Sequence, residues 1–190
     1  MAIVLASQSP RRQELLQRIG VEDFKTLSLD IDESYPEGLS PEDTGRYIAK
    51  KKCDAAAALC SPDDLIITAD TMVFLGNDRL GKPRDEEDAL RMLRALAGRG
   101  HTVCTGVSVR RGAQEERFAV STRVFFRPAT DDEIRAYIKT GEPMDKAGAY
   151  GVQSRGALFV ERIDGDFFNV MGLPVEQLGL VLARFGVKLL

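Results

Sequence analysis

The octapeptide at residues 5–12 reads LASQSPRR and combines two hydroxyls with two guanidiniums. It follows a short apolar run and precedes apolar residues at helical spacing, so it predicts a strand, a tight turn and a helix. Ser9 takes the N-cap place and Pro10 the first helical position, where its missing N–H costs nothing. Cations normally avoid the positive end of a helix dipole, so Arg11 and Arg12 there indicate a bound anion such as phosphate. A capped surface helix with two solvated arginines is the alternative.

Carboxylates follow two of the predicted strands. Three of them lie within residues 30–33, just past the predicted strand 24–29. Their oxygens could hold a divalent cation, and a solvated acidic loop is the alternative. Asp70 ends the apolar run 65–69, which predicts a buried strand with a carboxylate at its carboxyl end. Ligands collect beyond such strand ends in open α/β sheets, so we favour a catalytic or metal-linked role for Asp70 over a cap or turn.

Lysines supply further candidates for binding an anion. The predicted helix 41–59 carries three consecutive lysines at 50–52, and successive residues turn by about 100°, so at most one or two can point into a site. The pattern at 76–83 matches the start of a phosphate-binding P-loop. However, Pro83 stands where serine or threonine should hold magnesium, and proline removes a backbone donor. We therefore reject a P-loop and keep Lys82 as a single phosphate-binding lysine.

Composition excludes several other classes of function. The chain has 190 residues, of which 44% are hydrophobic and 29% charged, as expected for a soluble globular enzyme with one large domain or two small lobes. Its net charge of −3 gives no reason to expect nonspecific nucleic-acid binding. With a single histidine, His101, neither a His-rich metal site nor a Ser-His-Asp triad is well supported, so we expect His101 to be structural.

Cysteine use and hydropathy bear on localisation. The three cysteines have no Cys-x-x-Cys spacing, which is typical of reduced thiols in a cytoplasmic protein. The sequence shows no signal-peptide pattern at its start and no apolar run of membrane-spanning length, so we expect no membrane partner.

The predicted elements alternate along the chain. Strands are expected at 3–6, 24–29, 65–69, 103–109, 118–126, 158–163, 167–170 and 187–190. Helices are expected to begin near residues 10, 41, 85, 130 and 174, the fourth with a full capping box. This order, with one antiparallel hairpin, predicts an α/β protein with a mixed twisted central sheet flanked by helices. We expect two lobes around a cleft in which the arginines, Asp70 and Lys82 meet.

These residues form an ordered series of motifs that resembles the Maf family of nucleoside triphosphate pyrophosphatases. The resemblance covers nearly the whole chain, so residues 1–190 are interpreted as a single Maf-like domain. Its motifs are LASQSPRR at 5–12, DE at 32–33, ADT at 69–71, GKP at 81–83, GEP at 141–143, DKAGAYG at 145–151 and GLP at 172–174. Each motif is weak alone, but the complete order is specific. The resemblance implies a fold similar to that of inosine triphosphate pyrophosphatases.

The resemblance also implies an activity and its residues. Family members hydrolyse a nucleoside triphosphate between the α and β phosphates with Mg²⁺ or Mn²⁺, a house-cleaning role, and the family name implies a link to septum formation and division arrest. Asp70 would be the catalytic proton acceptor, and Glu33 with Asp70 would hold the metal. The triphosphate would be bound by Ser7, Ser9, Arg12, Lys52 and Lys82. The family also implies a homodimer. A nucleotide-binding division regulator without turnover is the rival interpretation.

Three positions would set the substrate within the family. Arg11, Thr71 and Gln153 resemble the subgroup that acts on dTTP and UTP. A glutamine amide offers both a donor and an acceptor, as the O4 and N3–H edge of a pyrimidine requires. The subgroup that prefers 7-methyl-GTP, which usually has glutamate in place of Gln153, is the alternative. One departure from the family pattern is Cys53 after Lys52, where alanine is usual; a thiol there packs as a small apolar group.

Overall fold

The computed structural model describes residues 2–190. Its strands are β1 (Ile3–Leu5), β2 (Phe24–Thr26), β3 (Leu65–Leu75), β4 (Asp78–Leu80), β5 (Gly100–Arg111), β6 (Gln114–Phe126) and β7 (Val160–Asp164). Its α-helices are α1 (Pro10–Arg18), α2 (Pro41–Ala57), α3 (Glu86–Leu96), α4 (Asp131–Ile138), α5 (Phe167–Met171) and α6 (Val175–Arg184). Short 3₁₀ helices are η1 (Glu142–Asp145), η2 (Ala147–Ala149) and η3 (Arg155–Phe159).

The strands form a seven-stranded mixed sheet in the order β2-β1-β3-β5-β6-β7, with β4 paired to β3. The strands β2, β1 and β3 run parallel, with Ile3 opposite both Phe24 and Leu65. The β3–β4 and β6–β7 pairs are antiparallel. The predicted α/β fold with a mixed central sheet is therefore confirmed. No helix within residues 2–190 is both long enough and apolar enough to cross a membrane.

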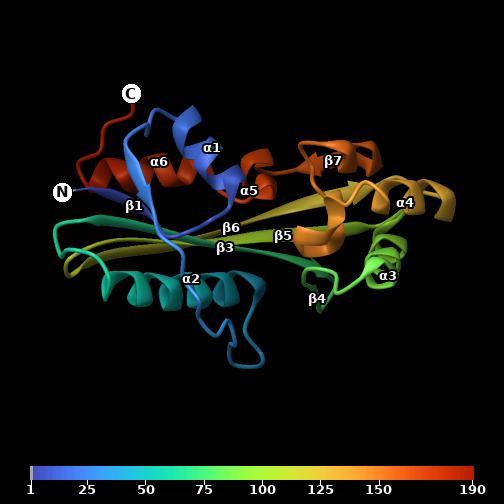
Figure 1. Ribbon diagram of the computed structural model, residues 1–190, viewed down its shortest axis with the longest axis horizontal. Coiled ribbons are helices and arrows are strands. Elements are labelled where there is room, and N and C mark those ends of the chain that lie inside the picture. The colour runs from blue at the N-terminus through green and yellow to red at the C-terminus, as the bar shows by residue number, and fades with distance from the viewer. Residues whose placement is uncertain (1) are drawn as a thin grey trace. The chain divides into compact units, whose positions relative to one another are not determined.

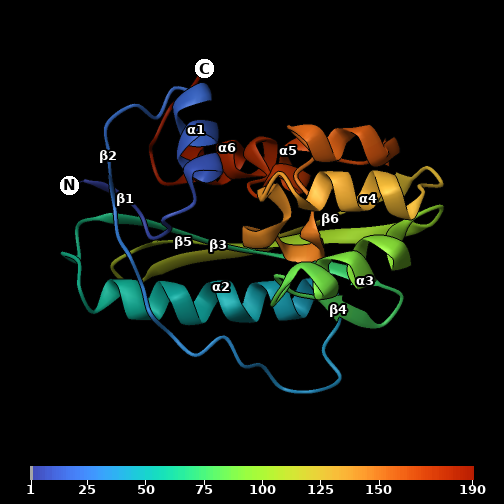
Figure 2. The same cartoon turned by 45° about the vertical axis from the view of Figure 1, so that its right-hand side comes forward.

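The chain divides into two compact units. Unit 1 comprises the residues up to Asp70 together with 105–120 and 172–190, and unit 2 comprises 71–104 and 121–171. In unit 1, α1 and α6 cover one face of the strands and α2 covers the other (Figures 1 and 2). The central strands β1 and β3 are buried on both faces, as expected for parallel strands between helices.

Helix α2 approaches β5 so closely that two glycines face each other. A Cβ atom added to Gly106 would lie 2.0 Å from the carbonyl carbon of Gly45. The helix is also tied to β3, because the buried Thr68 hydroxyl donates to the Ala49 carbonyl at 2.7 Å. Ser40 begins the helix as predicted, since its side chain accepts a hydrogen bond from the Asp43 amide. The position of α2 on the sheet is therefore set by backbone contact and by a buried hydrogen bond.

Unit 2 contains an aromatic cluster around the one histidine. His101 is buried, its Nε2 lies 2.8 Å from the Tyr150 hydroxyl, and its ring meets Phe126 edge to face. No hydrogen-bond partner of Nδ1 lies among the described residues. Burial lowers the pKa of His101 to about 4, because a charged imidazolium would lose its hydration there. His101 thus lies in the core of unit 2, where a structural role was expected.

We expect the buried histidine to make stability depend on pH. The folded pKa of about 4 lies below the ordinary value of 6.5. As the pH falls from about 6.5 towards about 4, His101 is protonated in the unfolded chain but stays neutral in the folded chain. The folded state therefore loses stability on acidification. The free energy of unfolding should drop by about 1 kcal/mol between about pH 7.5 and about pH 5.5. Urea unfolding at both values measures this drop.

The His101→Gln variant is the control for this effect. It should show a smaller difference in unfolding free energy between the same two pH values, whatever its absolute stability. An equal difference in both proteins would show that His101 does not cause it.

Several predicted elements were wrong in type or extent. The predicted strand 167–170 is helix α5, because the Asp166 carboxylate accepts hydrogen bonds from the Phe168 and Asn169 amides and so caps a helical turn. Residues 187–190 form no strand, β2 ends at Thr26, and the predicted strand 158–163 begins as η3. Strand β3 continues beyond Asp70, because pairing with β4 extends it to Leu75.

Candidate active site

Two carboxylates converge on one ammonium in unit 1. Lys52 Nζ lies 2.7 Å from Asp70 Oδ1 and 2.9 Å from Glu33 Oε1. Asp70 and Lys52 are largely buried, with side-chain exposures of 9% and 14%, whereas Glu33 is half exposed at 47%. The ammonium therefore offsets the repulsion between two carboxylates that would otherwise face each other.

We call Lys52, Asp70 and Glu33 the triad. The contact between α2 and β3 described above also places two of its members, Lys52 and Asp70, next to each other. Thr68 and Asp70 are two residues apart on β3, so their side chains point to the same face of the sheet. Ala49 and Lys52 are three residues apart on α2, so they lie on one side of the helix. Thr68 bonds to Ala49 and Asp70 bonds to Lys52. The carboxylate lies inside the strand rather than at its end, which corrects the prediction.

The second oxygen of Asp70 is the most informative atom of the site. Asp70 Oδ2 is buried, and no hydrogen-bond partner for it lies among the described residues. A buried carboxylate oxygen without a partner is costly, so such an oxygen calls for an explanation such as a catalytic role, a water or an ion. It is an acceptor that could take a proton from water or coordinate a cation.

The three lysines on α2 point in different directions, as the helical geometry predicted. Lys50 pairs with Asp54 on its own helix. Lys51 donates to the Ser34 carbonyl at 3.0 Å, and only Lys52 meets Asp70. The Lys51 contact fixes the segment that carries Glu33.

The acidic segment folds as a local turn that separates its carboxylates. Asp32 Oδ1 accepts from the Ser34 amide at 2.9 Å, and its other oxygen accepts from the Ser34 hydroxyl. These hydrogen bonds hold the pKa of Asp32 below its usual value. Glu33 between them reaches Lys52 instead. The predicted acidic cluster therefore contributes one carboxylate, Glu33, to the triad.

Arg12 is held by contacts from both ends of the sequence. Its Nε donates to the Gly172 carbonyl at 2.8 Å, and its Nη1 donates to the Ser7 hydroxyl at 3.2 Å. The Ser7 hydroxyl also accepts from the Ser9 amide at 3.2 Å. These bonds fix the plane of the guanidinium, which suits it to bind phosphate oxygens.

Electrostatics connect Arg12 to the carboxylates. Burial and the like charge of Arg11 lower the pKa of Arg12, while the charges of Asp70 and Glu33 oppose the shift. The net pKa of Arg12 is below its ordinary value, and the arginine remains charged because that value is so high. The site in unit 1 therefore combines two cations with two carboxylates.

Ser9 occupies the N-cap position as predicted, but its side chain makes no cap hydrogen bond. Its amide instead bonds to Ser7. The Gly172 carbonyl, which orients Arg12, was not predicted as part of the site. The GLP motif at 172–174 was the only available signal. It has the form of a turn before a helix, so it did not indicate a group that contacts the site.

Of the predicted specificity and phosphate-binding residues not yet described, Arg11 lies on α1 in unit 1 and the other three belong to unit 2. Thr71 follows Asp70 along β3, Lys82 is exposed after β4, and Gln153 is exposed in the loop before η3. The turn of Lys82 is tied down within unit 2, because the Gly148 amide donates to the Gly81 carbonyl at 3.1 Å. Their meeting with Asp70 in a cleft stays a prediction.

A metal ion at this site would need ligands in addition to those that the protein supplies. Among residues 2–190 no group of three or more His, Cys, Asp or Glu side chains could hold a metal ion. Asp70 and Glu33 form a pair only. Magnesium commonly binds through one or two carboxylates together with substrate phosphates and water, so this donor set fits that cation.

Comparison with known proteins decides the family. The model of the family described as Maf-like protein matches residues 2–185. The chain belongs to the Maf family. A Bacillus velezensis member named dTTP/UTP pyrophosphatase is 46% identical over 186 residues, which are 98% of this chain and 97% of the relative. A Dictyoglomus turgidum member of the same name is 46% identical over 191 residues, 99% and 98% of the two chains.

Structural comparison supports the fold of this Maf protein. A HAM1 protein from Coxiella burnetii superimposes with a TM-score of 0.51 at 13% identity, covering 97% of this chain and 99% of that one. At such low identity the likeness shows the fold alone. The expected mixed α/β architecture is thereby confirmed independently of the sequence motifs.

Proposed function

We propose that this Maf protein hydrolyses dTTP and UTP to the nucleoside monophosphate and pyrophosphate. The proposal is supported by relatives of that name over nearly the full chain. The observation that carries it is Asp70, a buried carboxylate bonded to Lys52 through one oxygen and unpartnered at the other. Such a group can orient a water molecule and accept its proton.

Each residue of unit 1 would have a distinct task. Asp70 Oδ2 accepts the proton of a water that attacks the α-phosphorus, and the bond to the β-phosphate oxygen breaks as pyrophosphate leaves. Arg12 and Lys52 bind phosphate oxygens and stabilise the negative charge that spreads over them in the transition state. Ser7 keeps Arg12 in place. Glu33 pairs with Lys52 and is half exposed, so a cation could reach it.

Magnesium or manganese completes the proposal. Glu33 and Asp70 would hold the cation, with substrate phosphates and water as its other ligands. When bound, the cation neutralises charge on the phosphate oxygens. Asp70 would hold the cation through a water molecule, since its Oδ2, which has no hydrogen-bond partner among the described residues, can then still accept a proton from water.

Substrate choice would depend on Arg11, Thr71 and Gln153, with Lys82 helping to bind phosphate. Gln153 is exposed and its amide can both donate to and accept from a pyrimidine edge. A substrate panel tests the activity. The purified chain is incubated with dTTP, UTP, ATP and 7-methyl-GTP plus Mg²⁺ or Mn²⁺, and pyrophosphate is measured.

The panel has three informative outcomes. Pyrophosphate release with the largest kcat/KM for dTTP and UTP supports the proposal. A preference for 7-methyl-GTP would assign the chain to the other subgroup. Binding without any turnover would favour a nucleotide-binding regulator of division.

Replacing Gln153 with glutamate should weaken the recognition of pyrimidine bases. A carboxylate only accepts, so the donor to O4 is lost and kcat/KM for dTTP and UTP should fall about 10- to 100-fold. The exposed Gln114→Glu variant adds the same charge elsewhere and should leave the kinetics unchanged. An unaltered substrate ranking in Gln153→Glu would reject the specificity argument.

A further inference from the structure

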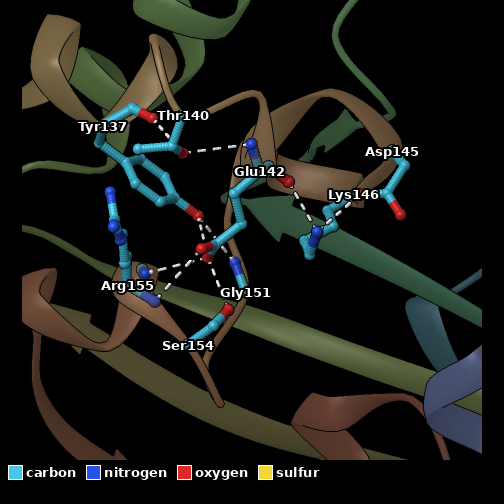
Figure 3. Close-up of polar contacts among 9 residues, drawn as sticks. Tyr137, Thr140, Glu142, Asp145, Lys146, Gly151, Ser154 and Arg155 are labelled. Carbon is cyan, nitrogen blue, oxygen red and sulfur yellow. Dashed lines mark hydrogen bonds and ion pairs between the residues drawn. The ribbon is translucent and has the colours of Figure 1, made fainter.

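One carboxylate in unit 2, that of Glu142, accepts several hydrogen bonds from the loop that carries Gln153. Glu142 Oε1 accepts from the Tyr137 hydroxyl at 2.7 Å, from the Ser154 hydroxyl at 2.7 Å and from the Gly156 amide at 3.2 Å (Figure 3). Its Oε2 accepts from the Arg155 amide at 3.3 Å. The carboxylate therefore bonds directly to three consecutive residues that follow Gln153.

The loop is also fixed on the side that precedes Gln153. The Gly151 amide donates to the Tyr137 hydroxyl at 3.1 Å, and that hydroxyl donates in turn to Glu142. The Ser154 amide closes the turn by donating to the Gly151 carbonyl at 3.4 Å. Gln153 is thus an exposed residue in a short loop that is linked to Glu142 by hydrogen bonds on both of its sides.

Two glycines allow the loop to come this close. A Cβ at Gly156 would lie 2.6 Å from the Gly151 carbonyl oxygen and 2.8 Å from the Tyr137 hydroxyl. A Cβ at Gly151 would lie 2.9 Å from Ser154 Oγ and 3.2 Å from Glu142 Oε1. Backbone atoms of Gly151 therefore leave no room for a side chain at position 156, whereas a side chain at position 151 would displace the ends of neighbouring side chains, Glu142 among them.

The position requires an ionised carboxylate. All four of the groups around it donate, so it must present acceptors only. Burial alone would raise the pKa of Glu142, but the hydrogen bonds from Ser154, Tyr137 and the backbone outweigh it and hold the pKa below its usual value.

We propose that Glu142 is a positioning residue for substrate choice, which holds loop 151–156 in the conformation that presents Gln153 to a pyrimidine base. This inference rests on the proposed function, because it needs Gln153 to read the base. Glu142 acts through the loop and does not touch substrate itself. Its removal should therefore cost discrimination between bases rather than the chemistry of phosphate cleavage.

A double-mutant cycle tests this coupling. The four proteins are wild type, Glu142→Ala, Gln153→Ala and the double variant, and the readout is kcat/KM for UTP relative to ATP. Each single variant should lower this ratio about 10-fold or more, since displacing a binding group by about an ångström can cost that much. The double variant should lose no more than the worse single variant, because both changes remove the same interaction.

Two accompanying measurements separate positioning from general stability. The KM for UTP should rise in Glu142→Ala while kcat changes much less, and amide exchange should speed up at 151, 155 and 156. Glu142→Gln should give a smaller loss, because its carbonyl can still serve the Oε1 partners while its NH₂ faces the Arg155 amide. The exposed Asp132→Ala, which removes an acidic charge from α4, should match wild type.

The outcomes distinguish the two proposals. If wild type releases no pyrophosphate from any triphosphate, the proposed function fails and this inference fails with it. If wild type is active but the effects of Glu142→Ala and Gln153→Ala add, or the ratio does not move, the inference alone is overturned. Should Glu142→Ala not fold, the same cycle is run with Ser154→Ala and Glu142→Gln, and the same criteria apply.

Discussion

Asp70→Asn is expected to lower kcat for pyrophosphate release by at least about 10³-fold, because under the proposed function it removes the acceptor for the water proton and one anionic ligand of the cation. The substitution keeps the size and shape of the side chain. Its amide oxygen can still accept from Lys52, which lies 2.7 Å from Asp70 Oδ1. The fold should therefore survive, and the loss should appear in turnover rather than in stability.

The measurement is pyrophosphate release under saturating dTTP with either cation, alongside urea unfolding of the same samples. Asp63→Asn makes the same chemical change in the exposed turn before β3 and should behave as wild type. Near-normal turnover by a folded Asp70→Asn variant would refute the assignment of Asp70 as the proton acceptor.

Gly106→Ala should produce the largest loss of stability. Its added Cβ would lie 2.0 Å from the Gly45 carbonyl carbon and 2.1 Å from the Gly45 oxygen, so helix α2 would have to move away from β5. Backbone atoms cannot give way as a flexible side chain can, and we expect a cost of about 3 kcal/mol or more. Because α2 carries Lys52, activity should fall as well.

Denaturant unfolding measures this cost. Gly179→Ala is the matched control, since the nearest atom to its added Cβ is 3.9 Å away and it lies within α6. Alanine there should stabilise the helix slightly, by about 0.5 to 1 kcal/mol. If Gly106→Ala unfolds at the wild-type denaturant concentration, the close packing of α2 on the sheet is wrong.

Local chemistry made much of unit 1 predictable. Pro10 begins α1 and Ser40 caps α2, because both depend on residues within one turn. Helical geometry alone indicated that only one or two of the three lysines could reach a site, and only Lys52 meets Asp70. These inferences needed no knowledge of distant residues.

Long-range contacts were beyond such reasoning. Arg12 and the Gly172 carbonyl are 160 residues apart in sequence, and no local pattern pairs them. The helix at α5 was predicted as a strand because a short apolar run fits either structure, and the Asp166 cap decides between them. The GEP motif was noticed, but the role of Glu142 became visible only when Tyr137 and loop 151–156 were seen around it.

The most direct test of the account is the position at which a triphosphate is cut. The purified protein is given dTTP in ¹⁸O-labelled water with Mg²⁺, and the products are identified by mass spectrometry. The account predicts one dTMP and one unlabelled pyrophosphate for each dTTP consumed, with the label in dTMP, because water attacks the α-phosphorus. Release of inorganic phosphate and dTDP, or label in pyrophosphate, would contradict it.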